Sequence, residues 1–186
     1  MRLVYILRHG HSEHLLGGFQ HRVSSCRYVH SLRRWENASL TPEGHEQAEG
    51  VAARLRKACS CILSSPMRRT MQTASIVAGE EHEVRPLPLL REIDELPWRL
   101  PHWLRLREYT WFYVIFLLML LDGRVLRLLR EAGQVLCGAL HAGRPCLLVS
   151  HKARILSLLV YARLHPRWRV VSCDLEPAGV TILARV

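Results

Sequence analysis

Two histidines and two arginines are the residues whose types and spacing could do chemistry in this sequence. Arg8 and His9 follow the apolar run LVYIL. Arg69 comes shortly after the run CIL, and His151 directly after PCLLVS. A neutral imidazole is a good nucleophile when a backbone carbonyl holds its other nitrogen, and arginines bind phosphoryl oxygens well. These residue types suit phosphoryl transfer without a metal, provided that a nearby carboxylic acid protonates the leaving oxygen.

Each of these residues alone is weak support for such chemistry. A single histidine at the end of a strand is more often a hydrogen-bonded structural residue, and a lone arginine usually faces solvent. The chemical interpretation therefore depends on the elements that would bring the four residues together.

Short apolar segments alternate with segments of helical period, which predicts an α/β fold. We expect a three-layer sandwich with a mostly parallel central sheet and helices on both faces. Strands are predicted at 3–7, at 59–65, within 83–90, at 145–150 and at 178–186. Ligands bind outside the carboxyl ends of the strands in such a sheet, where helix N-termini also point amide donors at an anion. The histidines and arginines should therefore converge on one crevice.

Capping residues predict the limits of the first two helices. Thr41 is expected to be an N-cap, with Pro42 as the first helical residue and the helical period carried by 44–57. The next helix should have Pro66 in its first turn and Gly79 at its end.

The second half of the chain contains two more predicted helices and a strongly apolar segment. The helices are expected at 123–140, which Gly133 could interrupt, and at 153–164. The segment WFYVIFLLMLL, 111–121, is uncharged but well short of the roughly 20 residues that a spanning helix needs. No membrane span is expected, and the segment is interpreted as buried core, a dimer interface or an apolar wall over a pocket.

Length and charge limit the classes of function. The 186 residues fit a single domain, 1–186, which can bury about 70% of its unfolded surface. The net charge is +10, and of the 26 lysines and arginines only Lys57 and Lys152 are lysines. An excess of arginine is compatible with anionic substrates or with nucleic acid. Because no nucleic-acid motif accompanies it, dedicated nucleic-acid binding is not expected.

The cysteines and the first residues indicate a compartment. The six cysteines include no CxxC pair, which gives zinc or redox chemistry little support. The sequence starts with MRLVYIL and continues directly into the segment RHG, without the pattern of a secretory leader. We therefore expect reduced thiols and a cytoplasmic protein.

Four segments resemble motifs of the histidine phosphatase superfamily, which includes the cofactor-dependent phosphoglycerate mutases. LRHGHSE resembles the RHG signature, and LTPEGHEQA resembles the helix start LTxxGxxQA. LSSPMRRTMQTA is similar to SSPLxRAxQTA, and LVSHKARILSLL is similar to the VSHGxxI segment. The four matches occur in the family's order and are together specific, although RHG alone is weak. The resemblance implies a phosphoglycerate mutase-like fold.

The resemblance also implies roles for four residues, which we call the clamp: Arg8, His9, Arg69 and His151. His9 would be the nucleophile, with Arg8 beside it. Arg69 would be the second arginine on the phosphate, and His151 the second histidine. Because the two arginines and two histidines already supply positive charge to the phosphoryl group, neither a metal nor a cofactor is expected for this chain.

The proton donor is predicted from a fifth, looser similarity. LLREIDELPWRL is similar to the family's LREIDxGxWEG, and this alignment makes Glu92 the acid, with Trp98 also matching. Asp94 and Glu95 are rivals. The alternative for Glu92 is a solvated loop carboxylate, because acids in polar loops are usually exposed.

The chain departs from the family around the clamp. Lys152 stands where a glycine follows the second histidine, and its ammonium could bind phosphate or point outward. Ser12 is the other substrate-binding candidate. His11 replaces a common glutamate, and Leu96 and Arg99 replace a glycine and an acid. The residues that select the substrate have therefore changed more than the clamp.

A phosphomonoesterase is the favoured function. The family's mutases usually carry insertions that this short chain lacks, and its apolar segment suits a small or partly apolar phosphorylated substrate. A phosphoglycerate mutase is one alternative. Another is a module that senses phosphate or binds phosphoproteins with weak turnover. Expected partners are the substrate, inorganic phosphate and a second copy of the chain in a homodimer.

Overall fold

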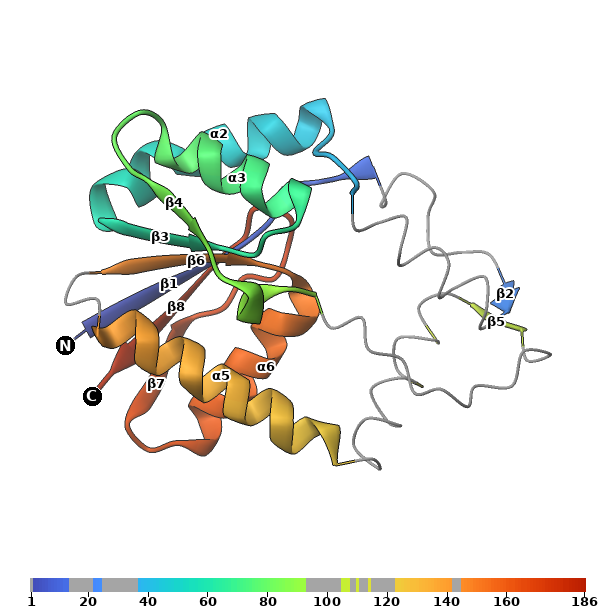
Figure 1. The fold of residues 1–186 in the computed structure, drawn as a ribbon, viewed down its shortest axis with the longest axis vertical. Coiled ribbons are helices and arrows are strands. Elements are labelled where there is room, and N and C mark those ends of the chain that lie inside the picture. The colour runs from blue at the N-terminus through green and yellow to red at the C-terminus, as the bar shows by residue number, and fades with distance from the viewer. Residues whose placement is uncertain are drawn as a thin grey trace.

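The computed structural model describes residues 2–13, 22–24, 37–92, 105–107, 110, 114, 123–141 and 145–186. Figure 1 shows a central sheet with helices on both of its faces. The strands of this sheet are β1 (Arg2–Arg8), β3 (Cys61–Ser64), β4 (Val84–Pro86), β6 (Cys146–Ser150), β7 (Trp168–Ser172) and β8 (Val180–Arg185). The helices are α2 (Pro42–Ala58), α3 (Arg68–Ala78), the short 3-10 helix η2 (Pro88–Leu90), α5 (Arg124–His141) and α6 (Lys152–Leu164).

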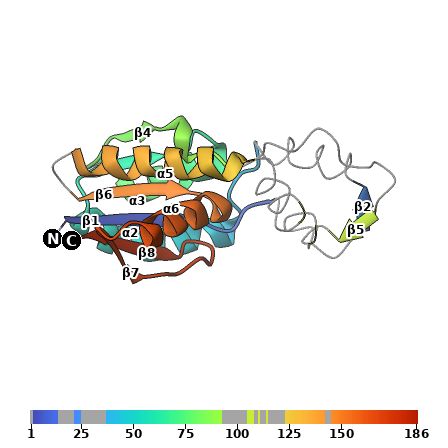
Figure 2. The same ribbon diagram turned by 90° about the horizontal axis from the view of Figure 1, so that it is seen from below.

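The sheet has the strand order β4-β3-β6-β1-β8-β7. Strands β4, β3, β6 and β1 run parallel, whereas β8 is antiparallel to both of its neighbours, β1 and β7. The prediction of a mostly parallel sheet is confirmed. Because β8 returns beside β1, Arg2 pairs with Arg185, and both termini lie at one end of the sheet (Figure 2). The carboxyl ends of β1, β3 and β6 lie at the other end.

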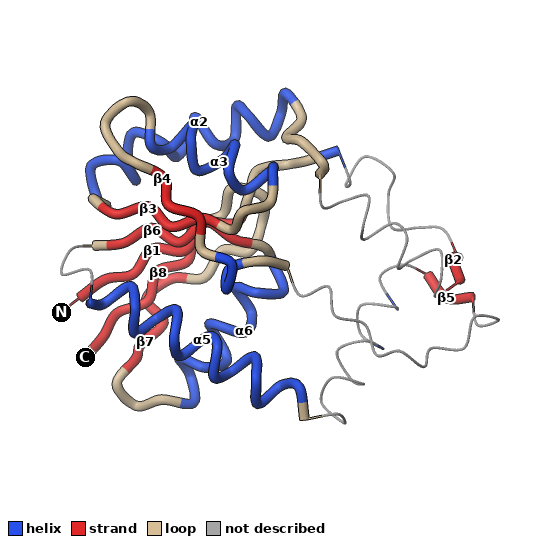
Figure 3. Tube along the Cα trace, in the orientation of Figure 1, coloured by secondary structure: helices blue, strands red, loops and turns tan. Residues whose placement is uncertain are grey.

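Helices cover both faces of the sheet, as the continuous apolar runs predicted. Helices α2 and α3 lie on one face, and α5 and α6 lie on the other (Figure 3). Val4 and Ile6 of β1 belong to the core under α5 and α6, whereas Leu7 belongs to the core under α2 and α3. In β6, Leu148 packs in the first core and Leu147 in the second. Both strands are therefore apolar at every inner position.

Three strands were not predicted. β7 is an edge strand whose side chains are mostly exposed, so its sequence WRVVS lacks the apolar pattern of a core strand. β2 (Arg22–Ser24) and β5 (Arg105–Arg107) pair antiparallel in a separate two-stranded sheet. Each of these two strands contains a single apolar residue, Val23 or Leu106, so no apolar run marks it in the sequence.

The start of α2 agrees with its prediction. Thr41 is the N-cap, and its Oγ1 accepts a hydrogen bond from the Gly44 amide at 3.1 Å. Pro42 is the first helical residue, where its missing N–H removes no helical hydrogen bond.

The predicted start of α3 was wrong by two residues. Pro66 does not lie in the first turn, because the helix begins at Arg68 with Met67 as its N-cap. The Thr70 hydroxyl lies 2.6 Å from the Met67 carbonyl oxygen and 2.9 Å from the Ser65 carbonyl oxygen. The chain before the helix therefore forms a tight turn. The predicted end is confirmed.

Helix α5 runs without interruption through Gly133. The glycine has a packing role, because a β-carbon there would lie 2.8 Å from the ring of Tyr161 in α6. It therefore lets α5 and α6 pack closely, which the sequence alone did not show.

In the described ranges, no helix is long and apolar enough to cross a bilayer. Of the apolar segment 111–121, only Val114 is described. The predictions of a core, interface or pocket wall for this segment thus lie outside the described residues.

Candidate active site

The clamp lies at the end of the sheet where three neighbouring parallel strands, β3, β6 and β1, terminate. Arg8 at the end of β1 pairs in register with Ser150 at the end of β6, and Ser64 of β3 pairs with Val149 of β6. His9, Ser65 and His151 each follow one of these strand ends. Because the strands end at the same level, the residues that follow them meet, as the sequence predicted.

His9 is buried, and its contacts define its tautomer. Its Nδ1 lies 2.8 Å from the carbonyl oxygen of Gly10. A carbonyl only accepts, so Nδ1 carries the proton and Nε2 keeps a lone pair. Arg69 Nε donates to this Nε2 at 3.3 Å, and both side chains are 2% exposed. His9 therefore has one nitrogen held by backbone and a nucleophilic nitrogen beside a guanidinium.

His151 lies beside His9 and is fully buried. The two ring centroids are 5.1 Å apart, with the ring planes at 60°. His151 Nε2 is 3.0 Å from the hydroxyl of Ser65, and its Nδ1 is 3.6 Å from Glu92 Oε2. The serine thus fixes the imidazole so that its other nitrogen faces the carboxylate.

The two clamp arginines are buried, which is costly for a permanent charge. Arg8 Nη1 donates to the Leu175 carbonyl at 2.7 Å. Its Nε is buried and has no hydrogen-bond partner within the described part of the chain. Burial lowers the pKa of the Arg8 guanidinium, and the negative charges of Glu176 and Glu92 oppose that effect. A buried donor of this kind is suited to an anion.

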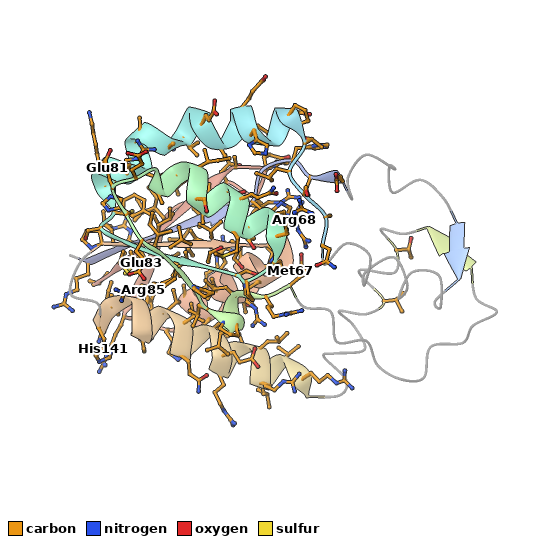
Figure 4. The ribbon with its side chains drawn as sticks, turned by 45° about the horizontal axis from the view of Figure 1, so that its top comes forward. Met67, Arg68, Glu81, Glu83, Arg85 and His141 are labelled. Atoms are coloured by element: carbon orange, nitrogen blue, oxygen red, sulfur yellow. The ribbon has the colours of Figure 1, made fainter. Side chains whose placement is uncertain are left out.

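Figure 4 shows how charges are distributed around α3. Met67 and Arg68 lie at the N-terminal end of α3, which also carries Arg69, whereas Glu81 and Glu83 lie beyond the other end of the helix. Glu83 forms a 3.0 Å ion pair with its neighbour Arg85. These carboxylates therefore do not compete with an anion for the clamp arginines.

The remaining site candidates have different surroundings. Glu92 follows η2, and its side chain is 25% exposed and lies beside His151, so its role as the acid stays a prediction. Ser12 is fully buried and forms an antiparallel bridge with Leu40. Lys152 is the exposed first residue of α6. The rivals Asp94 and Glu95 lie outside the described residues.

Several residues that support the clamp were not recognised from the sequence. Ser65 holds His151, although only its place in the SSP motif could have indicated this. Thr73 Oγ1 accepts from the Gly10 amide at 3.2 Å, and Gln47 Oε1 accepts from the His11 amide at 2.9 Å. Thr73 and Gln47 belong to the QTA and QA parts of the motifs, so these motif residues hold the loop that carries His9.

A close backbone approach explains two motif glycines. A β-carbon on Gly10 would collide with the Gly44 carbonyl, and one on Gly44 would collide with the His11 carbonyl. The loop after β1 can therefore lie against the start of α2 only because both positions lack a side chain.

A metal site has no support among these residues. In the described ranges, no group of three or more histidines, cysteines, aspartates and glutamates is placed to hold a metal ion. The described cysteines Cys59, Cys61, Cys137, Cys146 and Cys173 form no disulfide with one another.

The family follows from a comparison of the whole chain. The profile of the histidine phosphatase superfamily (branch 1) matches residues 4–185. The chain belongs to this superfamily. A search of the curated proteins finds no match.

Several solved structures share the fold of this chain. A phosphoserine phosphatase from Entamoeba histolytica, in complex with 3-phosphoglyceric acid, is 23% identical over 98% of this chain and 90% of its own, with a TM-score of 0.63. A mycobacterial glucosyl-3-phosphoglycerate phosphatase, in complex with VO3, is 20% identical over 99% and 91%, with a TM-score of 0.61. YhfR of Bacillus stearothermophilus is 19% identical over 98% and 90%, with a TM-score of 0.65. These similarities confirm the predicted α/β architecture.

Proposed function

We propose that this histidine phosphatase superfamily protein is a metal-independent phosphomonoesterase. The observation that carries the proposal is the His9 ring, whose Nδ1 is held by the Gly10 carbonyl while its Nε2 lies 3.3 Å from Arg69 Nε. A nucleophile with a fixed tautomer beside a buried cation is suited to attack on a phosphoryl group.

In the proposed first step, His9 Nε2 attacks phosphorus and the bond to the leaving oxygen breaks. The Arg8 and Arg69 guanidiniums bind the three remaining phosphoryl oxygens, and His151 Nδ1 donates to the same charge. Glu92 supplies the proton for the leaving oxygen, so the product departs as an alcohol. Arg8 Nε, which is buried without a hydrogen-bond partner among the described residues, would bind one of the oxygens.

In the second step, water attacks the phosphohistidine and restores the enzyme. The Glu92 carboxylate, now deprotonated, takes a proton from this water, and the N–P bond breaks to release inorganic phosphate. No cofactor enters either step. Ser12 and Lys152 remain candidates for contacts with the substrate at the edge of the site.

The proposed substrate is a small or partly apolar phosphomonoester. Two of the similar structures are named as phosphatases for phosphoserine and for glucosyl-3-phosphoglycerate, which supports hydrolysis of small phosphorylated metabolites. The apolar segment 111–121 supports a less polar leaving group.

The test is a turnover screen over phosphomonoesters in the presence of a chelator, with phosphoglycerate mutation assayed in parallel. Acid-labile, base-stable phosphoenzyme should form on His9, and His9→Ala should abolish both the phosphoenzyme and turnover. Normal turnover in His9→Ala, or activity that needs added zinc or magnesium, would contradict the mechanism. A single burst of product without turnover would favour a phosphate-binding module, and transfer between positions of phosphoglycerate would favour a mutase.

A further inference from the structure

An arginine in the first turn of α6 is buried, although the proposed chemistry does not use it. Arg154 lies three residues after His151, and its side chain is 7% exposed. The N-terminal end of a helix disfavours positive charge, and burial of a guanidinium costs free energy unless it is paired and hydrogen-bonded. This position therefore needs partners that compensate for both costs.

Those partners come from two other elements. Arg154 Nη1 donates to Glu131 Oε2 of α5 at 2.9 Å, and its Nε donates to the backbone carbonyl of Arg91 at 3.2 Å. Glu131 also lies 3.8 Å from Arg127, one turn earlier on α5. The carboxylate neutralises the buried guanidinium and orients its planar donors. The hydrogen bond from Arg154 Nε to the Arg91 carbonyl therefore has a fixed direction.

The carbonyl that Arg154 binds belongs to the residue directly before Glu92. The carbonyl one residue earlier, on Leu90, accepts from the Ser150 hydroxyl at 2.8 Å. Glu92 itself lies 3.6 Å from His151. Three successive residues of the chain, 90–92, are thus held by residues on either side of the junction between β6 and α6.

We propose that Arg154, oriented by Glu131, is a positioning residue that holds Glu92 within reach of the leaving oxygen. The inference rests on the proposed function, in which Glu92 is the acid. A general acid must lie within roughly 2.6–3.2 Å of the atom that it protonates, and a displacement of about 1 Å can cost about 100-fold in rate. Because Glu92 is partly exposed, packing alone confines it less than the clamp residues.

The test is Arg154→Met, made in the wild-type protein and in Glu92→Gln. The rate of the pre-steady-state burst is measured with an alkyl phosphate and with an aryl phosphate of an acidic phenol, whose oxygen leaves without a proton. Arg154→Met should slow the alkyl phosphate by about 10-fold or more and change the aryl phosphate little. In the Glu92→Gln background the same substitution should cost nothing further, because the acid through which it acts is gone.

Two controls separate positioning from general loss of structure. Arg163→Met removes an exposed arginine from the last turn of the same helix and should leave both burst rates unchanged. Arg154→Met combined with Glu131→Met removes both partners of the buried pair, which proteins tolerate better than removal of one. If the single variant does not fold, this double variant should show the same selective loss on alkyl phosphates.

The outcomes distinguish the two proposals. If Arg154→Met slows the burst equally with both substrates, the role of Arg154 is overturned and the acid stays in place. The same follows if Arg154→Met slows the burst as much in the Glu92→Gln background as in the wild-type protein. Unchanged burst rates in folded Arg154→Met would do the same. A harmless Glu92→Gln would overturn the assignment of the acid, and the role of Arg154 with it.

Discussion

The two halves of the site are built differently. The clamp half is fully packed: His9, Arg69 and His151 are at most 2% exposed, and the loop after β1 lies against α2 without room for a β-carbon. The donor half depends on Glu92, which is 25% exposed and follows a short 3-10 helix. Its backbone is held by single side-chain hydrogen bonds from Ser150 and Arg154. Phosphate binding is therefore built into the core, whereas protonation depends on a segment docked onto it.

This difference implies that the two functions can be lost separately. Damage to the clamp half should affect every substrate, because each contains the same phosphoryl group. Damage to the donor half should affect only substrates whose leaving oxygen needs a proton.

Among the residues around the nucleophile, the largest expected effect is in the clamp half, for Arg69→Gln. The phosphorylation rate should fall roughly 1,000-fold for alkyl and aryl phosphates alike, because the guanidinium stabilises charge on the transferred group. Burst kinetics with both substrate types measure the loss. Arg68→Gln is the matched control, since Arg68 is the exposed neighbour in α3 and should tolerate the change. Comparable losses in both variants would mean that the alignment of this motif is shifted by one residue.

A smaller and selective effect is expected in the donor half, for Glu92→Gln. Phosphorylation by alkyl phosphates should slow by roughly 100-fold, the usual order for a lost general acid, and aryl phosphates should suffer less. The comparison uses the burst phase, because the same carboxylate should activate water in the second step. If Asp94→Asn or Glu95→Gln shows this pattern while Glu92→Gln is harmless, the acid is one of those residues.

The last expected effect concerns stability, and it arises at the end of the sheet opposite the clamp, where β3 and β6 begin. Burial raises the pKa of the Cys59 and Cys146 thiols to about 12. Both thiols therefore stay protonated in the folded protein while those of the unfolded chain ionise near pH 9. Stability should fall as pH rises from about 9 toward about 12, because ionisation of these thiols favours the unfolded chain.

Urea unfolding at several alkaline pH values measures this change. Cys59→Ala should weaken the dependence on pH, whereas Cys137→Ala, which removes an exposed thiol, should not. Equal slopes in the wild-type protein and Cys59→Ala would show that burial of the Cys59 thiol is not the cause.

The parts of the fold that could be predicted from the sequence are the strands that helices cover on both faces of the sheet. β1, β3 and β6 are continuous or nearly continuous apolar runs, and their ends place His9, Arg69 and His151. β7 was missed because its residues are mostly exposed at the edge of the sheet. Pro66 was placed in a helix because proline suits a first turn, but here it precedes the N-cap Met67.

The contacts that complete the site could not be predicted, because they join distant parts of the chain. His151 and Ser65 are 86 residues apart, and Arg154 and Arg91 are 63 residues apart. Nothing local in the sequence pairs such residues. The motif similarities predicted which residues meet at the sheet edge, but not which serine or arginine holds them in place.

The bond from His9 Nδ1 to the Gly10 carbonyl also determines the regiochemistry of any phosphoenzyme. Phosphohistidine exists as two isomers, with the phosphoryl group on either ring nitrogen. Nδ1 carries a proton and donates it in a hydrogen bond to the carbonyl oxygen at 2.8 Å, so only Nε2 has a lone pair free to attack. The covalent intermediate would therefore be the tele isomer, and reagents selective for the pros isomer should not recognise it.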